Sequence, residues 1–228
     1  VIKSSDTDSS YVIENISLEY DMVTEKELAR QIKQQYDSKI AILYDRILRH
    51  RKITVNKKDP VWNFNLNVPA RSMKGILMLF EDSSSYARDP ESFYNPKIQK
   101  VEITIEGVPN QLYSQGMMPH QHFNETKRYF GYGKNREREV GLVSDALGLS
   151  DVSIGHFLTT KYGLWLDMRT TDDNSLHGSG RNVLNASEGI TIQINKKVEA
   201  SGTINAYIFI VMDAQLNIEN GRFVNALY

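Results

Sequence analysis

The residues best suited by type to do chemistry are His120, His122 and Glu125, which combine two imidazoles and a carboxylate. Zinc is bound by donors of these kinds when they converge on one point. Pro119 precedes them, and proline is favoured in the first turn of a helix. On a helix, side chains two positions apart point roughly 200° away from each other. His120 and His122 are therefore not expected to share a metal ion.

Two other polar groups could support catalysis or ion binding. Ser179 lies between two glycines, as a nucleophilic serine often does, but the strand and helix that flank a nucleophile elbow are missing from its surroundings. Asp172 and Asp173 could hold calcium, although Asp-Asp-Asn is also typical of a surface turn. The sequence has no cysteine and no glycine-rich phosphate-binding loop. We predict no enzymatic activity and no cofactor.

Composition leaves room for a substantial core and gives no overall charge preference. The chain has 228 residues, of which 40% are hydrophobic, and 27 basic residues against 28 acidic ones. A near-neutral chain has no general attraction to nucleic acid or to a membrane surface. No segment approaches the roughly 18 apolar residues of a membrane span. The polar start predicts a linker over residues 1–10, cut from a longer polypeptide, followed by a single domain over 11–228.

Apolar residues recur mainly with the period of a β-strand. The clearest case is Trp62, Phe64, Leu66 and Val68, which alternate with asparagines. Eight strands are predicted, over Tyr11–Tyr20, Lys39–Leu48, Val61–Val68, Met73–Glu81, Ile98–Glu106, Tyr162–Arg169, Gly189–Lys197 and Thr203–Met212.

The predicted strands are of two kinds. Gly75–Phe80 and Ala206–Met212 are almost continuously apolar, which is typical of strands covered on both faces. The strands over Ile98–Glu106 and Gly189–Lys197 alternate between isoleucine or valine and polar residues, which indicates one face in water.

Helices are predicted only as insertions. Thr24 and Glu27 have the spacing of a capping box, and apolar residues follow at helical spacing at Leu28, Ile32 and Tyr36. A second helix is predicted to begin near Pro119, and a third over Glu137–Leu147.

Three long connections separate predicted strands, over Asp82–Pro96, Pro109–Pro119 and Thr170–Glu188; the first and third are polar, and the second is too apolar for a free loop. Eight strands joined by long end loops fit a jelly roll better than an up-and-down barrel, whose connections are tighter. We therefore predict an all-β fold, an eight-stranded jelly-roll sandwich with short helical insertions.

A basic group near the second predicted strand is a candidate surface for nucleic acid. Its members are Arg46, Arg49, Arg51 and Lys52. The alternative is a solvated strand end, the usual setting of such charges.

Four stretches together resemble a known protein family. They are VEITIEGVPNQLYSQGM at 101–117, LTTKYGLWLDMR at 158–169, LHGSGR at 176–181 with ASEGI at 186–190, and YIFIVMDAQLNI at 207–218. In this order they are similar to the C-terminal part of the major capsid proteins of Polinton/Maverick elements and adintoviruses. The similarity covers about residues 61–228, and the first sixty residues match only by position and strand pattern.

The resemblance implies a double jelly-roll capsid protein, with two eight-stranded sandwiches in one polypeptide. Such proteins trimerise into pseudo-hexameric capsomers that build an icosahedral shell. This chain would be the second jelly roll, either as a fragment or as a form that has lost the first. The implied location is the virion, assembled in the nucleus or cytoplasm of the host cell.

The resemblance also implies partners. They are other copies of the chain in a homotrimer and capsid lattice, the upstream jelly roll of the same polypeptide, minor capsid or penton proteins, and packaged DNA. No membrane partner is expected. The candidate interface residues are apolar residues of the long loops: Phe93, Tyr94, Leu112, Tyr113, Met117 and Met118. The alternative for them is that they cover the end of their own sandwich.

Two other functions remain open from the sequence. A stand-alone jelly roll could recognise a glycan or a protein through the loop Asp172–Arg181. A cupin-like enzyme would need a metal held by His120, His122 and Glu125.

Overall fold

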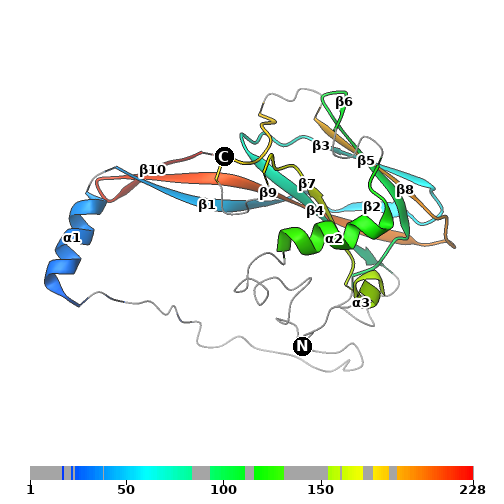
Figure 1. Ribbon diagram of the computed structural model, residues 1–228, viewed down its shortest axis with the longest axis horizontal. Coiled ribbons are helices and arrows are strands. Elements are labelled where there is room, and N and C mark those ends of the chain that lie inside the picture. The colour runs from blue at the N-terminus through cyan, green and yellow to red at the C-terminus, as the bar shows by residue number, and fades with distance from the viewer. Residues whose placement is uncertain are drawn as a thin grey trace.

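Two antiparallel β-sheets face each other in the computed structural model (Figure 1). The structure describes residues 17, 22, 24–37, 39–83, 93–110, 116–130, 154–159, 161–171, 177–184 and 189–227. The strands are β1 (Ile40–Arg49), β2 (Ile53–Asn56), β3 (Val61–Leu66), β4 (Met73–Asp82), β5 (Ile98–Ile105), β6 (Val108–Pro109), β7 (Gly163–Asp167), β8 (Ile190–Lys196), β9 (Thr203–Glu219) and β10 (Arg222–Leu227). The helices are α1 (Lys26–Tyr36), α2 (Pro119–Phe130) and α3 (Ile154–Thr159).

Strand order identifies the fold as a jelly roll. One sheet has the order β1-β9-β4-β7, and the other has the order β3-β8-β5-β6. From β2 to β9, successive strands of the chain therefore alternate between the two sheets, apart from the hairpin of β5 and β6. β2 continues the line of β1 along β9, and β10 pairs with the far end of β9. The predicted all-β jelly-roll sandwich is confirmed.

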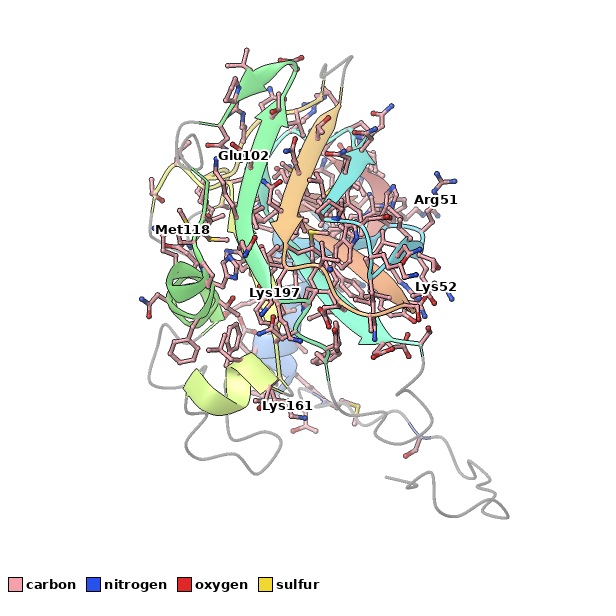
Figure 2. The ribbon with its side chains drawn as sticks, turned by 90° about the vertical axis from the view of Figure 1, so that its right-hand side faces the viewer. Arg51, Lys52, Glu102, Met118, Lys161 and Lys197 are labelled. Carbon is pink, nitrogen blue, oxygen red and sulfur yellow. The ribbon has the colours of Figure 1, made fainter. Side chains whose placement is uncertain are left out.

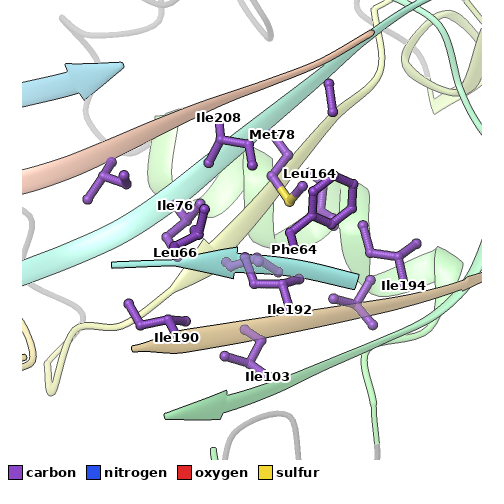
Figure 3. Packing of buried hydrophobic residues seen from close by; sticks show 14 of the residues in the cluster. Phe64, Leu66, Ile76, Met78, Ile103, Leu164, Ile190, Ile192, Ile194 and Ile208 are labelled. Carbon is purple, nitrogen blue, oxygen red and sulfur yellow. The ribbon is translucent and has the colours of Figure 1, made fainter. Parts of the chain in front are cut away.

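The hydrophobic core fills the space between the sheets. Trp62, Phe64 and Leu66 project inward from β3, and each is at most 2% exposed. Figure 3 shows Ile76, Met78, Leu164 and Ile208 of the larger sheet packed with residues of the smaller sheet. The alternation seen in the sequence thus has the physical cause proposed for it, because every second residue of these strands is withdrawn from water.

Most of the predicted strands are present, with some changes of extent. Except for Ser17, which is not in a strand, the predicted strand Tyr11–Tyr20 lies outside the described residues, and the other seven correspond to β1, β3, β4, β5, β7, β8 and β9. β9 continues to Glu219, well past the predicted end at Met212. β2, β6 and β10 were not predicted.

One prediction about the helices, the cap of α1, is wrong. α1 begins at Lys26, its N-cap residue is Glu25, and no side chain caps it. The predicted capping box of Thr24 and Glu27 is therefore wrong, because the helix starts one residue too late for Thr24 to be the N-cap. α2 begins at Pro119 as predicted. The helix predicted over Glu137–Leu147 lies outside the described residues, and α3 was not predicted.

α2 and α3 close one side of the sandwich. Thr126 of α2 donates a hydrogen bond to the Gly163 carbonyl of β7, at 3.1 Å. His122 and Phe157 are buried, and both contact the ring of Tyr162. The two helices therefore attach to the edge strand β7 through core contacts. Within the parts of the chain described above, no helix combines the length and apolar character needed to cross a membrane.

Candidate assembly surface

The outer faces of the two sheets differ in chemical character. The smaller sheet presents polar residues outward, including Asn63, Asn65, Thr191, Gln193 and Glu102, while its isoleucines point into the core. Glu102 lies on this face (Figure 2). Its carboxylate is 2.8 Å from the Lys100 ammonium. A face of this composition is well solvated and gives little hydrophobic drive for association.

The outer face of the larger sheet is apolar instead. Directly opposed residues on neighbouring strands point to the same side of a sheet. The cross-strand register therefore places Phe209, Leu77 and Trp165 in one row on this face. Neighbouring rows add Tyr207 with Leu79, and Ile47 with Val211. Ile47 is 64% exposed, whereas Trp165 is fully buried. We call this set of side chains the outer apolar face.

An ion cluster lies at the border of this face, with Lys74 and Asp213 buried and Asp45 exposed. Asp45 of β1 stands directly opposite Asp213 of β9, a pairing of like charges that would be unfavourable alone. Lys74 of β4 resolves it, because its Nζ lies 2.6 Å from Asp45 and 2.9 Å from Asp213. Lys74 lies at a β-bulge, since the register with β9 shifts between Met73 and Gly75. The bulge therefore coincides with the residue whose ammonium lies between the two carboxylates.

The cluster shifts the pKa values of its members. Burial by itself raises the pKa of Asp213, but hydrogen bonds from Ser72 and Lys74 and the lysine charge outweigh it and lower the pKa below its usual value. Burial likewise lowers the pKa of Lys74, and hydrogen bonds to Asp45 and Asp213 reverse this into a rise. Both residues are therefore held in their charged forms.

The same cluster fixes part of the long connection that precedes β8. Asp213 accepts hydrogen bonds from the Ser72 hydroxyl at 2.5 Å and from the Gly178 amide at 2.9 Å. Ser72 in turn accepts one from the Gly180 amide at 2.9 Å. The backbones of Met73 and Arg181 exchange hydrogen bonds in both directions. Residues 177–181 are thus attached to the larger sheet.

The predicted interface residues do not form one surface. Tyr94 donates a hydrogen bond to Glu199 at 2.5 Å and lies under the Lys57 ammonium, so it packs within its own chain. Met117 is 2% exposed and belongs to the core, whereas Met118 is 43% exposed. Phe93 is half-buried and pairs through its backbone with Lys161. Leu112 and Tyr113 lie outside the described residues.

The predicted basic group is also divided. Arg46 opposes Met212 on the core side of the larger sheet, while Arg49 opposes Phe209 on the outer side. Arg49 stacks over the Tyr207 ring at 5.4 Å. Arg51 and Lys52 are exposed, on the opposite side of the molecule from Met118 (Figure 2). The two predicted surfaces are therefore separate.

His122 has a structural setting. It is 1% exposed, and its Nδ1 lies 2.6 Å from the Tyr162 hydroxyl. Among the residues described, no three His, Cys, Asp or Glu side chains are grouped as metal ligands.

The predicted glycan-binding loop ends beside an open depression of about 590 Å³, lined by residues 108–110, 168–170 and 181. In this depression, Arg169 faces Asp167, and its Nε donates a hydrogen bond to Oδ1 of Asp167 at 2.9 Å.

Sequence reasoning missed both parts of this surface, although signals for them existed. The signal for the outer apolar face is the continuous apolar runs of β4 and β9, because such a strand has apolar residues on its outer face as well as on its core face. The ion cluster comes from Asp45, Lys74 and Asp213, single charges inside otherwise apolar strands. A charge in such a place usually has a partner.

Comparison with known proteins supports the fold. No protein-family profile matches the sequence, and no curated protein matches it. Among solved structures, VP54 of PBCV-1 matches with a TM-score of 0.54 at 11% identity, over 90% of this chain and 54% of that one. The PBCV-1 virus capsid matches with a TM-score of 0.53 at 10% identity, over 86% of this chain and 54% of the other. The chain thus spans about half the length of these neighbours, which are viral capsid proteins. At these identities, the likeness establishes a shared jelly-roll fold.

Proposed function

We propose that this chain is a structural jelly-roll domain of a viral major capsid protein. In this proposal it forms homotrimers that act as pseudo-hexameric capsomers of an icosahedral shell. The observation that carries it is the structural likeness of this jelly roll, with its strand order β1-β9-β4-β7 over β3-β8-β5-β6, to viral capsid chains about twice as long. The upstream half of such a protein would be another jelly roll in the same polypeptide.

The outer apolar face is the assembly surface in this proposal. Ile47, Leu77 and Phe209 lie on the outside of the larger sheet, where a solitary domain would have polar residues. Apolar residues at the centre of a protein interface and polar residues at its rim are the usual arrangement. Arg49 provides such a rim beside Phe209. The polar outer face of the smaller sheet would then face solvent.

The capsid lineage proposed is that of Polinton/Maverick elements and adintoviruses, as the sequence resemblance implies. Minor capsid or penton proteins would be further partners. Contact of Arg51 and Lys52 with packaged DNA is part of the same proposal, since both are exposed. Such contact would weaken steeply with salt, because binding to phosphates releases counterions.

The test is the mass of the natural-length polypeptide that contains these 228 residues, measured by sedimentation equilibrium. We expect three times the mass of one copy, independent of concentration across the micromolar range. Electron microscopy of the same sample should give particles of hexagonal outline. A stable monomer at all concentrations, with no such particles, would contradict the proposal.

A further inference from the structure

One half of the larger sheet extends beyond the smaller sheet. Figure 1 shows β1, β9 and β10 running away from β3, β5 and β8, with α1 at their far end. The extension consists of residues 40–44 of β1, 214–219 of β9 and the whole of β10. We call it the projecting ribbon. Its inner side continues the side of the larger sheet that elsewhere covers the core.

The inner side of the projecting ribbon is apolar and partly exposed. The register places Ile40, Ile218 and Phe223 in one cross-strand row, and Ile42 with Leu216 in the next. On the same side of β9, the core-facing residues between Ile204 and Met212, which are every second residue, are at most 1% exposed. On the ribbon, Ile42 is 39% exposed and Phe223 is 64% exposed. The core-facing pattern therefore continues where the opposing sheet has ended.

α1 presents a second apolar surface that is partly exposed. Leu28 and Ile32 lie one turn apart on the helix, and Leu28 is 43% exposed. The helix has 11 residues and no side-chain cap. Isolated helices of this length are marginally stable in water, and most helices in proteins depend on packing of an apolar face. α1 therefore requires a surface on which to place Leu28 and Ile32.

The two surfaces match in length. Eleven helical residues span about 16 Å at 1.5 Å per residue. The five residues of β1 in the projecting ribbon span about 17 Å at 3.4 Å per residue. A helix laid along the inner side would thus cover it from Ile40 to Tyr44. Packing a helix on a sheet face is a standard way to bury both.

The connection between α1 and β1 disfavours docking of α1 on its own ribbon. A tight reversal after a helix commonly uses glycine or asparagine in a left-handed conformation. The connection is Asp37-Ser38-Lys39, which contains neither. Asp37 has right-handed helical angles, with φ −74° and ψ −13°. The helix accordingly leaves the tip of the ribbon without turning back across its inner side (Figure 1).

We infer that α1 of one copy docks on the inner side of the projecting ribbon of a second copy. Leu28 and Ile32 would pack against Ile42, Leu216 and Phe223 of the partner copy. This inference rests on the proposed function, since a capsid supplies neighbouring copies. It adds a second contact between copies, separate from the outer apolar face, in which each chain gives a helix and receives one.

Cysteine cross-linking tests this contact, and the chain has no cysteine of its own. One preparation carries Ile32→Cys, and a second with a different affinity tag carries Ile42→Cys. After mixing and mild oxidation, we expect a disulfide that joins the two tags. The control replaces the second variant with Asn63→Cys, on the polar outer face, and should give no such product. A chain carrying both Ile32→Cys and Ile42→Cys that closes only within itself would overturn the inference.

Variants of α1 give a second measurement. Leu28→Asp should weaken self-association about tenfold or more, because the apolar contact of a buried leucine is lost. Gln34→Asp, on the opposite side of the same helix, should leave it unchanged. Equal effects of both variants would count against docking of α1. If the natural-length protein forms trimers while α1 cross-links to no ribbon, the inference fails and the proposed function stands. Cross-links without trimers would support docking of α1 and contradict the proposed function.

Discussion

The indole of Trp165 lies against Gly75, its diagonal neighbour across the β4–β7 pair, on the outer side of the larger sheet. A Cβ atom built on Gly75 would fall 2.3 Å from Cζ2 of Trp165 and 2.7 Å from the Leu166 carbonyl oxygen. Only a residue without a side chain permits the indole to lie this close to β4. The pair therefore sets the shape of the outer apolar face at the β7 edge.

Gly75→Ala should destabilise the chain by about 1–3 kcal/mol, the usual cost of overpacking a filled site. Urea unfolding followed by circular dichroism measures the change. Trp165→Phe removes the atoms nearest the added methyl group, so the double variant should recover part of the loss. Strict additivity of the two single changes would argue that the ring does not rest on Gly75.

Asp213→Asn should lower the free energy of unfolding by about 3 kcal/mol, because it leaves the buried Lys74 ammonium poorly compensated. Glu219→Gln, on the exposed end of the same strand, serves as the control and should have little effect. Chemical denaturation at neutral pH measures both. Equal stability of the two variants would contradict a stabilising role for the ion cluster.

The loss of folding stability at acid pH should depend on Asp213. Its pKa is lower in the folded chain than the ordinary value of 3.8. Its contribution is therefore complete above that value and is lost as the pH falls below 3.8 toward the folded pKa. Wild type should lose stability more steeply than Asp213→Asn in this range. Parallel pH profiles for the two proteins would contradict the lowered pKa.

Tyr162→Phe should cost about 1–3 kcal/mol, since it removes the hydroxyl that lies 2.6 Å from the buried imidazole of His122. Tyr44→Phe changes the same atom on a side chain that is 39% exposed and should be nearly neutral. Thermal unfolding of the two variants makes the comparison. A neutral Tyr162→Phe would mean that the contact does not help to attach α2.

The sequence predicted the sandwich well because alternation directly reflects burial. Trp62, Phe64 and Leu66 face a core, and the asparagines between them face water. Prediction failed where that relation weakens. The predicted strand ends at Met212, where the continuous apolar run stops, but β9 continues because Ala214, Leu216 and Ile218 keep the core-facing alternation between Asp213, Gln215 and Asn217. β2 and β6 have four and two residues, too few to display a period.

The candidate surfaces were less predictable because they depend on register between distant segments. Asp45 and Asp213 become neighbours only through the pairing of β1 with β9, and Lys74 reaches them only through a bulge. Loop residues such as Met117 and Tyr94 were assigned to an interface by their apolar character. The structure places Met117 in the core and Tyr94 against Glu199.

The most direct measurement of the central claim is native mass spectrometry of the natural-length polypeptide with Ile47→Asp, beside wild type and Asn63→Asp. Each change places a carboxylate at an exposed strand position, on the outer apolar face and on the polar outer face respectively. Burying an unpaired charge in an interface is strongly unfavourable. We predict trimers for wild type and Asn63→Asp, and folded monomers for Ile47→Asp. Intact trimers of Ile47→Asp would contradict assembly through the outer apolar face.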